Sequence, residues 1–197
     1  MNRPEPIACN KPYHLYNRGN DRRTIFHQPS DYDAFSQKMH LSARKHRVTL
    51  LAYALMPNHY HMLAVQQPDG DISAMMEALG TSTAKRFNAK YGHVGHLFQG
   101  PYQYRRAPTT GTVPLIARYI HLNPIRARLV KAPEDWRWSD FRRHLEGFGE
   151  GFLLPGYTEG GNLLRSLLPP DYVAFVRRGV TDIEAVRRIL FDDSEEK

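Results

Sequence analysis

The order of the predicted elements indicates an α+β protein, built as a ferredoxin-like βαββαβ sandwich with an added helix and a C-terminal helical extension. Short apolar segments of strand length alternate with two longer segments of helical periodicity, in the order strand, helix, strand, strand, helix, strand. The two consecutive central strands are apolar on both of their faces. This pattern predicts a sheet that is covered on each side.

The first strand is expected at residues 12–18, where an apolar and aromatic segment ends at the turn residues Gly19 and Asn20. A helix is expected at residues 30–46, with Ser30 as its N-terminal cap. The inward stripe of this helix consists of Tyr32, Phe35 and Met39.

A hairpin follows, with strands at residues 48–56 and 59–66 joined by a tight Pro-Asn turn. A Pro-Asp-Gly turn then leads into a second helix at residues 72–91. The fourth strand is expected at residues 102–107, which completes the βαββαβ order.

The added helix is expected at residues 112–130, with Thr112 as a cap and a strongly apolar face. It could cover the otherwise open face of the sheet. Beyond Leu145 the chain becomes rich in glycine and then predicts a helix at residues 172–190. We therefore expect a domain at residues 1–146, followed by a linker and helical extension at residues 147–197.

Composition restricts the class of protein. The chain weighs 22.8 kDa, has a formal net charge of +7 and an isoelectric point near 9.6, which suits a polyanionic partner and equally fits a basic soluble protein. Cys9 is the single cysteine, which excludes an intramolecular disulfide. We find no secretion signal and no apolar run of membrane-spanning length, and expect a cytoplasmic protein without a membrane partner.

A His-x-His pair, His59 and His61, lies inside the second strand of the hairpin. Residues two apart on a strand share a face and lie about 6.6 Å apart along the chain, so both imidazoles could bind one cation. The alternative is that each is an ordinary hydrogen-bonded core histidine. We interpret the pair as a metal site.

Tyr119 and Asn123 are four residues apart on the added helix. Residues at this spacing lie on one helix face, so the phenol and the amide would point to the same place. In the alternative, Tyr119 is a core aromatic and Asn123 caps a second short helix that begins at Pro124. Spacing alone leaves both interpretations open.

Four motifs, in order, resemble the REP-associated tyrosine transposases, a branch of the single-tyrosine HUH transposases. They are YHLYNRGNDRRTIF, MPNHYHML, GHLFQGPYQYR and YIHLNPIRARLV, and the later DWRWSDFRRHL is also similar to that family. The similarity covers roughly residues 12–145. It implies that Tyr119 is the nucleophile, that Asn123 joins His59 and His61 as a metal ligand, and that cleavage of single-stranded hairpin DNA leaves a 5′-phosphotyrosine and a free 3′-hydroxyl. The protein would act as a monomer or dimer.

The expected cofactor is a divalent metal ion, which would offset charge on the phosphate oxygens. Oxygen-rich coordination favours magnesium or manganese, whereas two imidazoles favour manganese or zinc, and we expect magnesium or manganese. A tyrosine with an ordinary pKa near ~10 is a weak nucleophile at neutral pH. The metal or an arginine, Arg118 or Arg126, would therefore help to ionise it.

Contacts to DNA are expected from arginines beside glycine and aromatic residues, a mixture that can bind phosphates and stack bases. For any one of them, the alternative is a solvated surface charge. Our candidates are Arg18, Arg22, Arg23, Arg105 and Arg106.

Three functions remain open on the sequence alone. The first is a strand transferase acting through Tyr119 on hairpin-forming repeated extragenic palindromes. The second is a metal-dependent nuclease that activates water, and the third is a noncatalytic module that binds single strands. A denaturing gel separates the three functions. The strand transferase would leave cut DNA attached to the protein, the nuclease would leave cut DNA free, and the binding module would leave the DNA intact.

Overall fold

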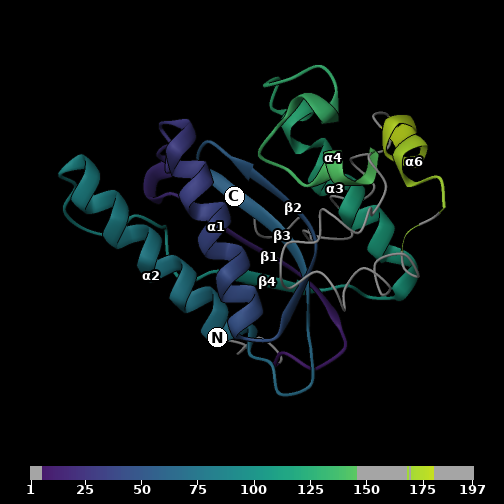
Figure 1. Cartoon of the computed structure of the whole chain (residues 1–197), viewed down its shortest axis with the longest axis horizontal. Coiled ribbons are helices and arrows are strands. Elements are labelled where there is room, and N and C mark those ends of the chain that lie inside the picture. Colours follow the sequence, from purple (N-terminus) through teal and green to yellow (C-terminus); the bar gives the residue numbers. More distant parts are fainter. Residues whose placement is uncertain (1–5, 146–167, 169, 180–197) are drawn as a thin grey trace.

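The computed structural model describes residues 6–145, 168 and 170–179 (Figure 1). Apart from a short helix at Phe141–Leu145, which was not predicted, the helices and strands run in the order expected from the sequence. Their bounds are β1 Pro12–Arg18, α1 Pro29–Lys45, β2 Val48–Met56, β3 His59–Gln66, α2 Ile72–Tyr91, β4 Gln103–Arg106, α3 Val113–Arg126, α4 Phe141–Leu145 and α6 Tyr172–Arg178. Short 3-10 helices lie at Asn20–Arg22, Thr110–Thr112 and Pro133–Asp135.

The four strands form one antiparallel sheet in the order β2-β3-β1-β4. This is the strand order of the ferredoxin-like split βαβ, so the predicted fold class is confirmed. The first strand of the chain therefore lies inside the sheet, between β3 and β4. Its register with β3 pairs Tyr16 with His61 and Arg18 with His59.

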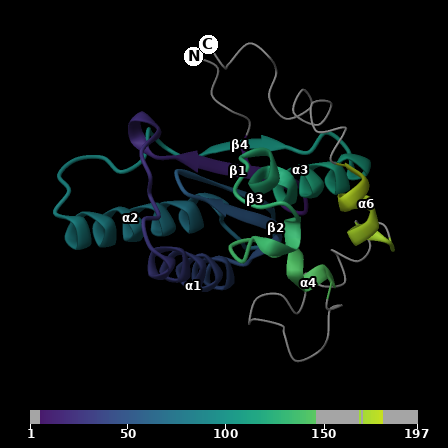
Figure 2. The same cartoon turned by 90° about the horizontal axis from the view of Figure 1, so that it is seen from above.

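The two faces of the sheet are covered by different helices. Along β3, Tyr60 and Met62 join a core cluster with α1 and α2, whereas Leu63 and Val65 join a second cluster with α3. Figures 1 and 2 show α1 and α2 together on one side of the sheet and α3 apart from them. Because side chains alternate along a strand, His61 faces the side of α3.

The start of α1 differs from the prediction. Gln28 caps this helix instead of Ser30, because Pro29 fits the first helical position and moves the start back by one residue. The Asp31 carboxylate accepts the backbone N–H groups of His27 and Gln28, each at 3.0 Å, and completes a capping box.

Helix α3 also differs in its details. Thr112 makes no capping bond to the helix, and its hydroxyl instead donates to the Thr109 carbonyl at 2.7 Å. The helix continues through Pro124 and ends at Arg126, four residues before the predicted end. The alternative in which Asn123 caps a second helix is therefore wrong.

The chain after α3 returns to the core. The Leu55 N–H donates to the Trp138 carbonyl at 2.9 Å, so this segment runs beside β2. Tyr172 and Val176 of α6 are buried in the core cluster of α3. The predicted linker and the part of the last helix beyond Gly179 lie outside the described residues. No helix in the described part of the chain is both long enough and apolar enough to cross a bilayer.

Candidate active site

The predicted metal pair lies on the α3 side of the sheet. The ring centroids of His59 and His61 are 5.0 Å apart, and the ring of Tyr119 on α3 lies 5.8 Å from that of His61. As expected from the sequence, α3 therefore brings its tyrosine to the two histidines. Two strand residues and one helix residue, separated by almost 60 positions in the chain, share one side of the sheet.

Hydrogen bonds orient both imidazoles. The Asn58 amide donates to the Arg22 carbonyl at 3.1 Å, which turns its oxygen toward His59, whose Nδ1–H donates to it at 2.6 Å. Nδ1 of His61 lies 2.9 Å from Nε2 of His14. Among the described residues no hydrogen bond reaches the Nε2 atom of His59 or His61, so these two nitrogens are potential metal ligands.

The surroundings keep both imidazoles neutral. Burial, with the charge of Arg18, lowers the pKa of His59 to about 4. Burial also lowers the pKa of His61 well below its usual value, and His14, His59, Arg126 and Arg18 act in the same direction. Only a neutral imidazole can bind a metal ion, so the pair fits a divalent cation at neutral pH.

Tyr119 and Asn123 lie one turn apart on α3 and are buried, with 6% and 7% of their surfaces exposed. The Asn123 amide donates to the Tyr119 carbonyl at 2.9 Å, which leaves its Oδ1 to accept a bond or bind a cation. An amide oxygen together with two imidazole nitrogens would be a suitable donor set for manganese, magnesium or zinc.

The two arginines proposed to help ionise Tyr119 point in different directions. The guanidinium of Arg126 lies 5.3 Å from the centre of the Tyr119 ring. That of Arg118 instead lies 4.4 Å from the ring centre of Phe175 on α6. Of the two, Arg126 is therefore the one that lies against the Tyr119 ring, whereas Arg118 lies against α6.

Sequence reasoning assigned no role to His14, which is fully buried beneath the site. Its ring stacks on His61 at 5.0 Å and meets the Tyr119 ring edge-on at 6.3 Å. Burial lowers the pKa of His14 to about 3, so this imidazole is neutral. The available signal was its position two residues before Tyr16 and four before Arg18, on one face of the predicted first strand.

Arg18 is the predicted DNA contact that lies beside the metal pair. Its backbone is paired with His59 across the two strands, and paired residues share a face. Its Nε is enclosed and finds no acceptor among the described residues. Burial, with the charge of Arg22, lowers its pKa from the usual value for arginine.

The GHLFQG segment is hydrogen bonded to the chain around Arg18. The Asn20 N–H donates to the Leu97 carbonyl at 2.8 Å, and the Gln99 N–H donates to the Arg18 carbonyl at 2.9 Å. The Gly19 N–H donates to the Asn58 carbonyl at 2.8 Å, which joins this loop to the turn before His59. A Cβ at Gly19 would overlap the Arg23 carbonyl, so glycine is needed there for close approach.

The other two arginines of this loop are held differently. Arg22 has a left-handed backbone, with φ of 58°, and its carbonyl accepts the Asn58 amide. Arg23 donates to Nε2 of His93 at 2.6 Å. The loop therefore presents its arginines from a backbone that is fixed at several points.

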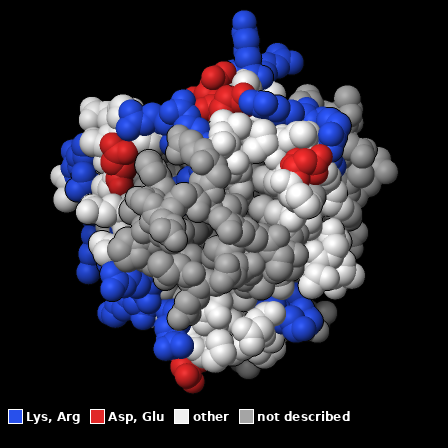
Figure 3. Space-filling view, turned by 45° about the vertical axis from the view of Figure 1, so that its right-hand side comes forward, with Lys and Arg blue, Asp and Glu red and all other residues white. Residues whose placement is uncertain are grey.

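The predicted pair on β4 is divided between the two faces. Arg105 is paired with His14 and lies on the face of the site, whereas Arg106 is paired with Tyr13 and lies on the opposite face. In Figure 3, lysine and arginine side chains lie in groups at the top, on the left and at the bottom of the view, and acidic side chains lie near several of these groups. The strand register, more than the surface charge, shows which of these two arginines lies on the face of the site.

A second histidine cluster lies on another side of α3. One nitrogen or oxygen atom from each of His121, Asp140 and His144 lies within 4.8 Å of the others, so the group could hold a metal ion. Both nitrogens of His121 are, however, hydrogen bonded, with Nε2 2.9 Å from the Asp140 carboxylate and Nδ1 2.8 Å from the Tyr172 hydroxyl. The Asp140 carboxylate also accepts the Tyr53 N–H at 2.7 Å.

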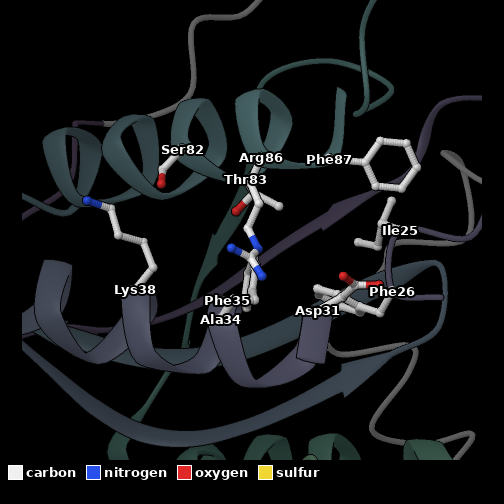
Figure 4. A pocket seen from close by; sticks show the side chains of 10 residues that line it. All are labelled: Ile25, Phe26, Asp31, Ala34, Phe35, Lys38, Ser82, Thr83, Arg86 and Phe87. Atoms are coloured by element: carbon white, nitrogen blue, oxygen red, sulfur yellow. The ribbon is translucent and has the colours of Figure 1, made fainter. Parts of the chain in front are cut away.

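A small open pocket of about 30 Å³ lies away from the site, between α1 and α2. Figure 4 shows Arg86 extending from α2 toward Phe35 on α1. The remaining lining residues are Ile25, Phe26, Asp31, Ala34, Lys38, Ser82, Thr83 and Phe87. This pocket is on the sheet face opposite the two metal-pair histidines, because its aromatic residues belong to the other core cluster.

Comparison with known proteins gives one family. The family model described as "Transposase IS200 like" matches residues 8–123, which is more than half of the chain. A solved structure of a REP-associated tyrosine transposase bound to a REP hairpin is 18% identical, with a TM-score of 0.62 over 80% of this chain and 91% of that chain. A protein described as a transposase from Deinococcus radiodurans R1 is also 18% identical, with a TM-score of 0.43 over 66% of this chain and 92% of that one. No curated protein matches.

Proposed function

Because the chain belongs to the IS200-like transposase family, we propose that it cuts and rejoins single-stranded DNA through Tyr119, with a divalent metal ion bound by His59, His61 and Asn123. The coarser activity, DNA processing by a transposase, follows from the family. The nucleophile, the ligands and the metal dependence are our proposal.

One observation carries the proposal. The Tyr119 ring lies 5.8 Å from the ring of a neutral His61 whose Nδ1 is already hydrogen bonded, so a tyrosine and a prepared metal ligand meet on one side of the sheet. A packing role for this tyrosine would not require two imidazoles beside it with their Nε2 atoms unused. The pattern is that of a nucleophile next to a cation site.

The proposed step is an in-line displacement at phosphorus. Tyr119 Oη loses its proton to solvent and forms a bond to the phosphorus atom, while the bond from phosphorus to the 3′-oxygen breaks. The departing oxygen takes a proton from water and becomes a 3′-hydroxyl, and the 5′-phosphate stays on the tyrosine. The phosphodiester is exchanged for a phosphotyrosine, so a second 3′-hydroxyl can reverse the step and join a new strand.

The residues around Tyr119 have separate tasks in this step. The bound ion would neutralise charge on the nonbridging phosphate oxygens. Arg126 favours the ionised phenol by its charge beside the ring. Asn123 holds the Tyr119 carbonyl through its amide and offers its oxygen to the ion.

Arg18 is the strongest candidate for a DNA contact, because it is partly exposed and is paired with His59 on the face of the metal pair. Arg105 shares that face, and we propose that both bind phosphates near the cut. Arg22, Arg23 and Arg106 would bind the strand farther away.

The substrate we propose is a single-stranded hairpin of the repeated extragenic palindromic type. The support is the fold shared with the transposase that was solved with a REP hairpin. We further propose that the protein acts in the cytoplasm and that residues 1–146 carry the chemistry, with residues 147–197 as an extension.

A hairpin substrate labelled on the 3′ side of the cut tests the nucleophile. Native protein with manganese should retain label after denaturation, whereas label on the 5′ side should leave as a free strand. Tyr119→Phe removes one oxygen and should abolish the adduct while folding and DNA binding survive. Tyr172→Phe is the matched control on the other side of α3, and it should keep the adduct. An adduct formed by Tyr119→Phe would assign the nucleophile to another residue.

The water-activated nuclease is a second candidate, favoured by the burial of Tyr119, which has only 6% of its surface exposed. In that function the ring packs against the ligands and water attacks the phosphate. Cut DNA that never carries protein, equal in native protein and in Tyr119→Phe, would establish this alternative.

A further inference from the structure

We propose that His14 is a positioning residue for the metal site, which accepts the Nδ1–H of His61 and thereby directs Nε2 of His61 to the ion. This inference rests on the proposed function, because it concerns the same site. It adds a supporting residue from β1 behind the proposed ligands, which come from β3 and α3.

The argument begins with the contact between the two rings. Nε2 of His14 lies 2.9 Å from Nδ1 of His61, so one of these atoms carries a proton and the other accepts it. A His61 imidazole that binds an ion through Nε2 must carry its proton on Nδ1. The proton in this contact then belongs to His61, and His14 is the acceptor.

The packing around His14 fixes the position of that acceptor. The imidazole is fully buried, stacks on the Tyr16 ring at 5.0 Å and stacks on the His61 ring at the same distance. The Tyr119 ring meets it edge-on at 6.3 Å. A ring enclosed by three aromatic neighbours cannot turn away, so it holds both the tautomer and the direction of His61.

The two metal-pair histidines are therefore held by different groups. Asn58 accepts from His59 with an amide oxygen, whereas His61 relies on a neutral imidazole. Many metal-bound histidines donate instead to a carboxylate. A neutral acceptor adds no negative charge to the site, which suits a substrate that brings its own charged phosphate.

A pair of variants separates the hydrogen bond from the ring. His14→Gln places an amide oxygen near the position of Nε2, and His14→Met has a side chain of similar length without a good acceptor. Manganese binding is measured by calorimetry on the full chain, without DNA. We expect His14→Met to weaken binding about 10-fold to 100-fold, and His14→Gln to stay within about threefold of native.

Two controls accompany this measurement. His40→Met removes a histidine from α1, on the other face of the sheet, and should leave manganese affinity unchanged. Cobalt absorption spectra of native protein and the two His14 variants should show a changed ligand field only in His14→Met. Melting in EDTA reports any general loss of stability, which a merely structural role would produce equally in the Met and Gln variants.

Equal affinity in native protein and His14→Met, or equal loss in the Met and Gln variants, would overturn the role of His14 alone. If native protein shows no manganese site that depends on His59 and His61, the proposed metal site fails as well. Nitrogen chemical shifts of the zinc-loaded native protein give a test without any variant. They should show a protonated Nδ1 in His61 and an unprotonated Nε2 in His14, and the reverse would contradict the proposal.

Discussion

Two buried histidine clusters lie on different sides of α3, and they differ in what their nitrogen atoms do. In the site, His59 and His61 use Nδ1 for hydrogen bonds, and no described residue engages their Nε2 atoms. In the other cluster, both nitrogens of His121 are hydrogen bonded, to Asp140 and to Tyr172. The presence of histidine alone therefore does not identify a metal ligand. The hydrogen-bond partners show which histidine is oriented to bind an ion and which one connects parts of the structure.

The electrostatics of Asp140 support the same distinction. Burial would raise the pKa of this carboxyl, but the His121 charge and hydrogen bond, with His144 and the Tyr53 N–H, hold it below its usual value. The carboxylate is therefore ionised and satisfied inside the protein. Asp140 lies just before α4, and its hydrogen bonds connect this part of the chain to α3 and to β2.

The largest expected effect comes from removing the metal pair. Replacing His59 and His61 together with alanine should abolish cleavage and weaken manganese binding by more than about a hundredfold, while hairpin binding stays largely intact. Calorimetry and a cleavage assay measure the two effects. His144→Ala is the control from the other cluster and should leave one ion bound. If native protein bound two ions and His144→Ala lost one of them, the second histidine cluster would also be a metal site. The contrast between the two clusters would then be wrong.

An effect of intermediate size is expected from acid. Burial, chiefly, lowers the pKa values of His40 and His144 to about 4, below the value of about 6.5 in an unfolded chain. Between pH 6.5 and 4 the unfolded state therefore binds more protons, and the stability of the metal-free protein should fall as the pH falls. Asp140 acts below this window, because its lowered pKa contributes stability that is lost only at more acidic pH.

Urea unfolding in EDTA at several pH values measures this slope. His144→Gln should reduce it by at most about 1.4 kcal/mol per pH unit, the value for one proton. A slope that is unchanged in His144→Gln would show that this histidine is already accessible to protons in the native state.

The smallest effect is expected from Tyr172→Phe. This change removes the hydroxyl bonded to Nδ1 of His121 and should cost about 1 kcal/mol of unfolding free energy, with cleavage unchanged. Thermal melting and the adduct assay measure the two quantities. If Tyr172→Phe lost the adduct without losing stability, Tyr172 of α6 would have a role in catalysis.

Local signals predicted most of the elements. The bounds of β1, β2, β3 and α2 agree residue for residue with the expected ones, because glycine, proline and aspartate turns mark their ends. β4 is one residue shorter at each end than predicted. The helix caps were less predictable. Gln28 caps α1 instead of Ser30, and this depends on the hydrogen bond that the Asp31 carboxylate accepts from the Gln28 N–H.

The parts of the site that the sequence missed depend on pairing between distant strands. The contact between His14 and His61 joins residues 47 positions apart, and it exists because β1 lies between β3 and β4. The same register divides Arg105 from Arg106. The pair of β3 histidines was visible in the sequence because its geometry is local to one strand.

The sequence allows two expectations for the last helix of the extension after Leu145. Either Arg177, Arg178, Arg187 and Arg188 form an accessory basic face, or the helix packs on the core and its arginines are solvated. In the structure Arg177 pairs with Glu134 at 2.6 Å and Arg178 with Asp171 at 2.9 Å, whereas the last two lie outside the described residues. The described part of the extension contributes to the core beside α3.

The central place of β1 in the sheet has a consequence for synthesis of the chain. This strand leaves the ribosome first, yet its partners β3 and β4 follow only at residues 59–66 and 103–106. The β2 and β3 hairpin is local and can form early, but the tyrosine arrives only with α3. A gene interrupted before the codon of Tyr119 would therefore encode both histidines of the pair without the nucleophile. Such a product would lack Asn123 and most of the core of α3 as well, and it could not form the proposed tyrosine adduct.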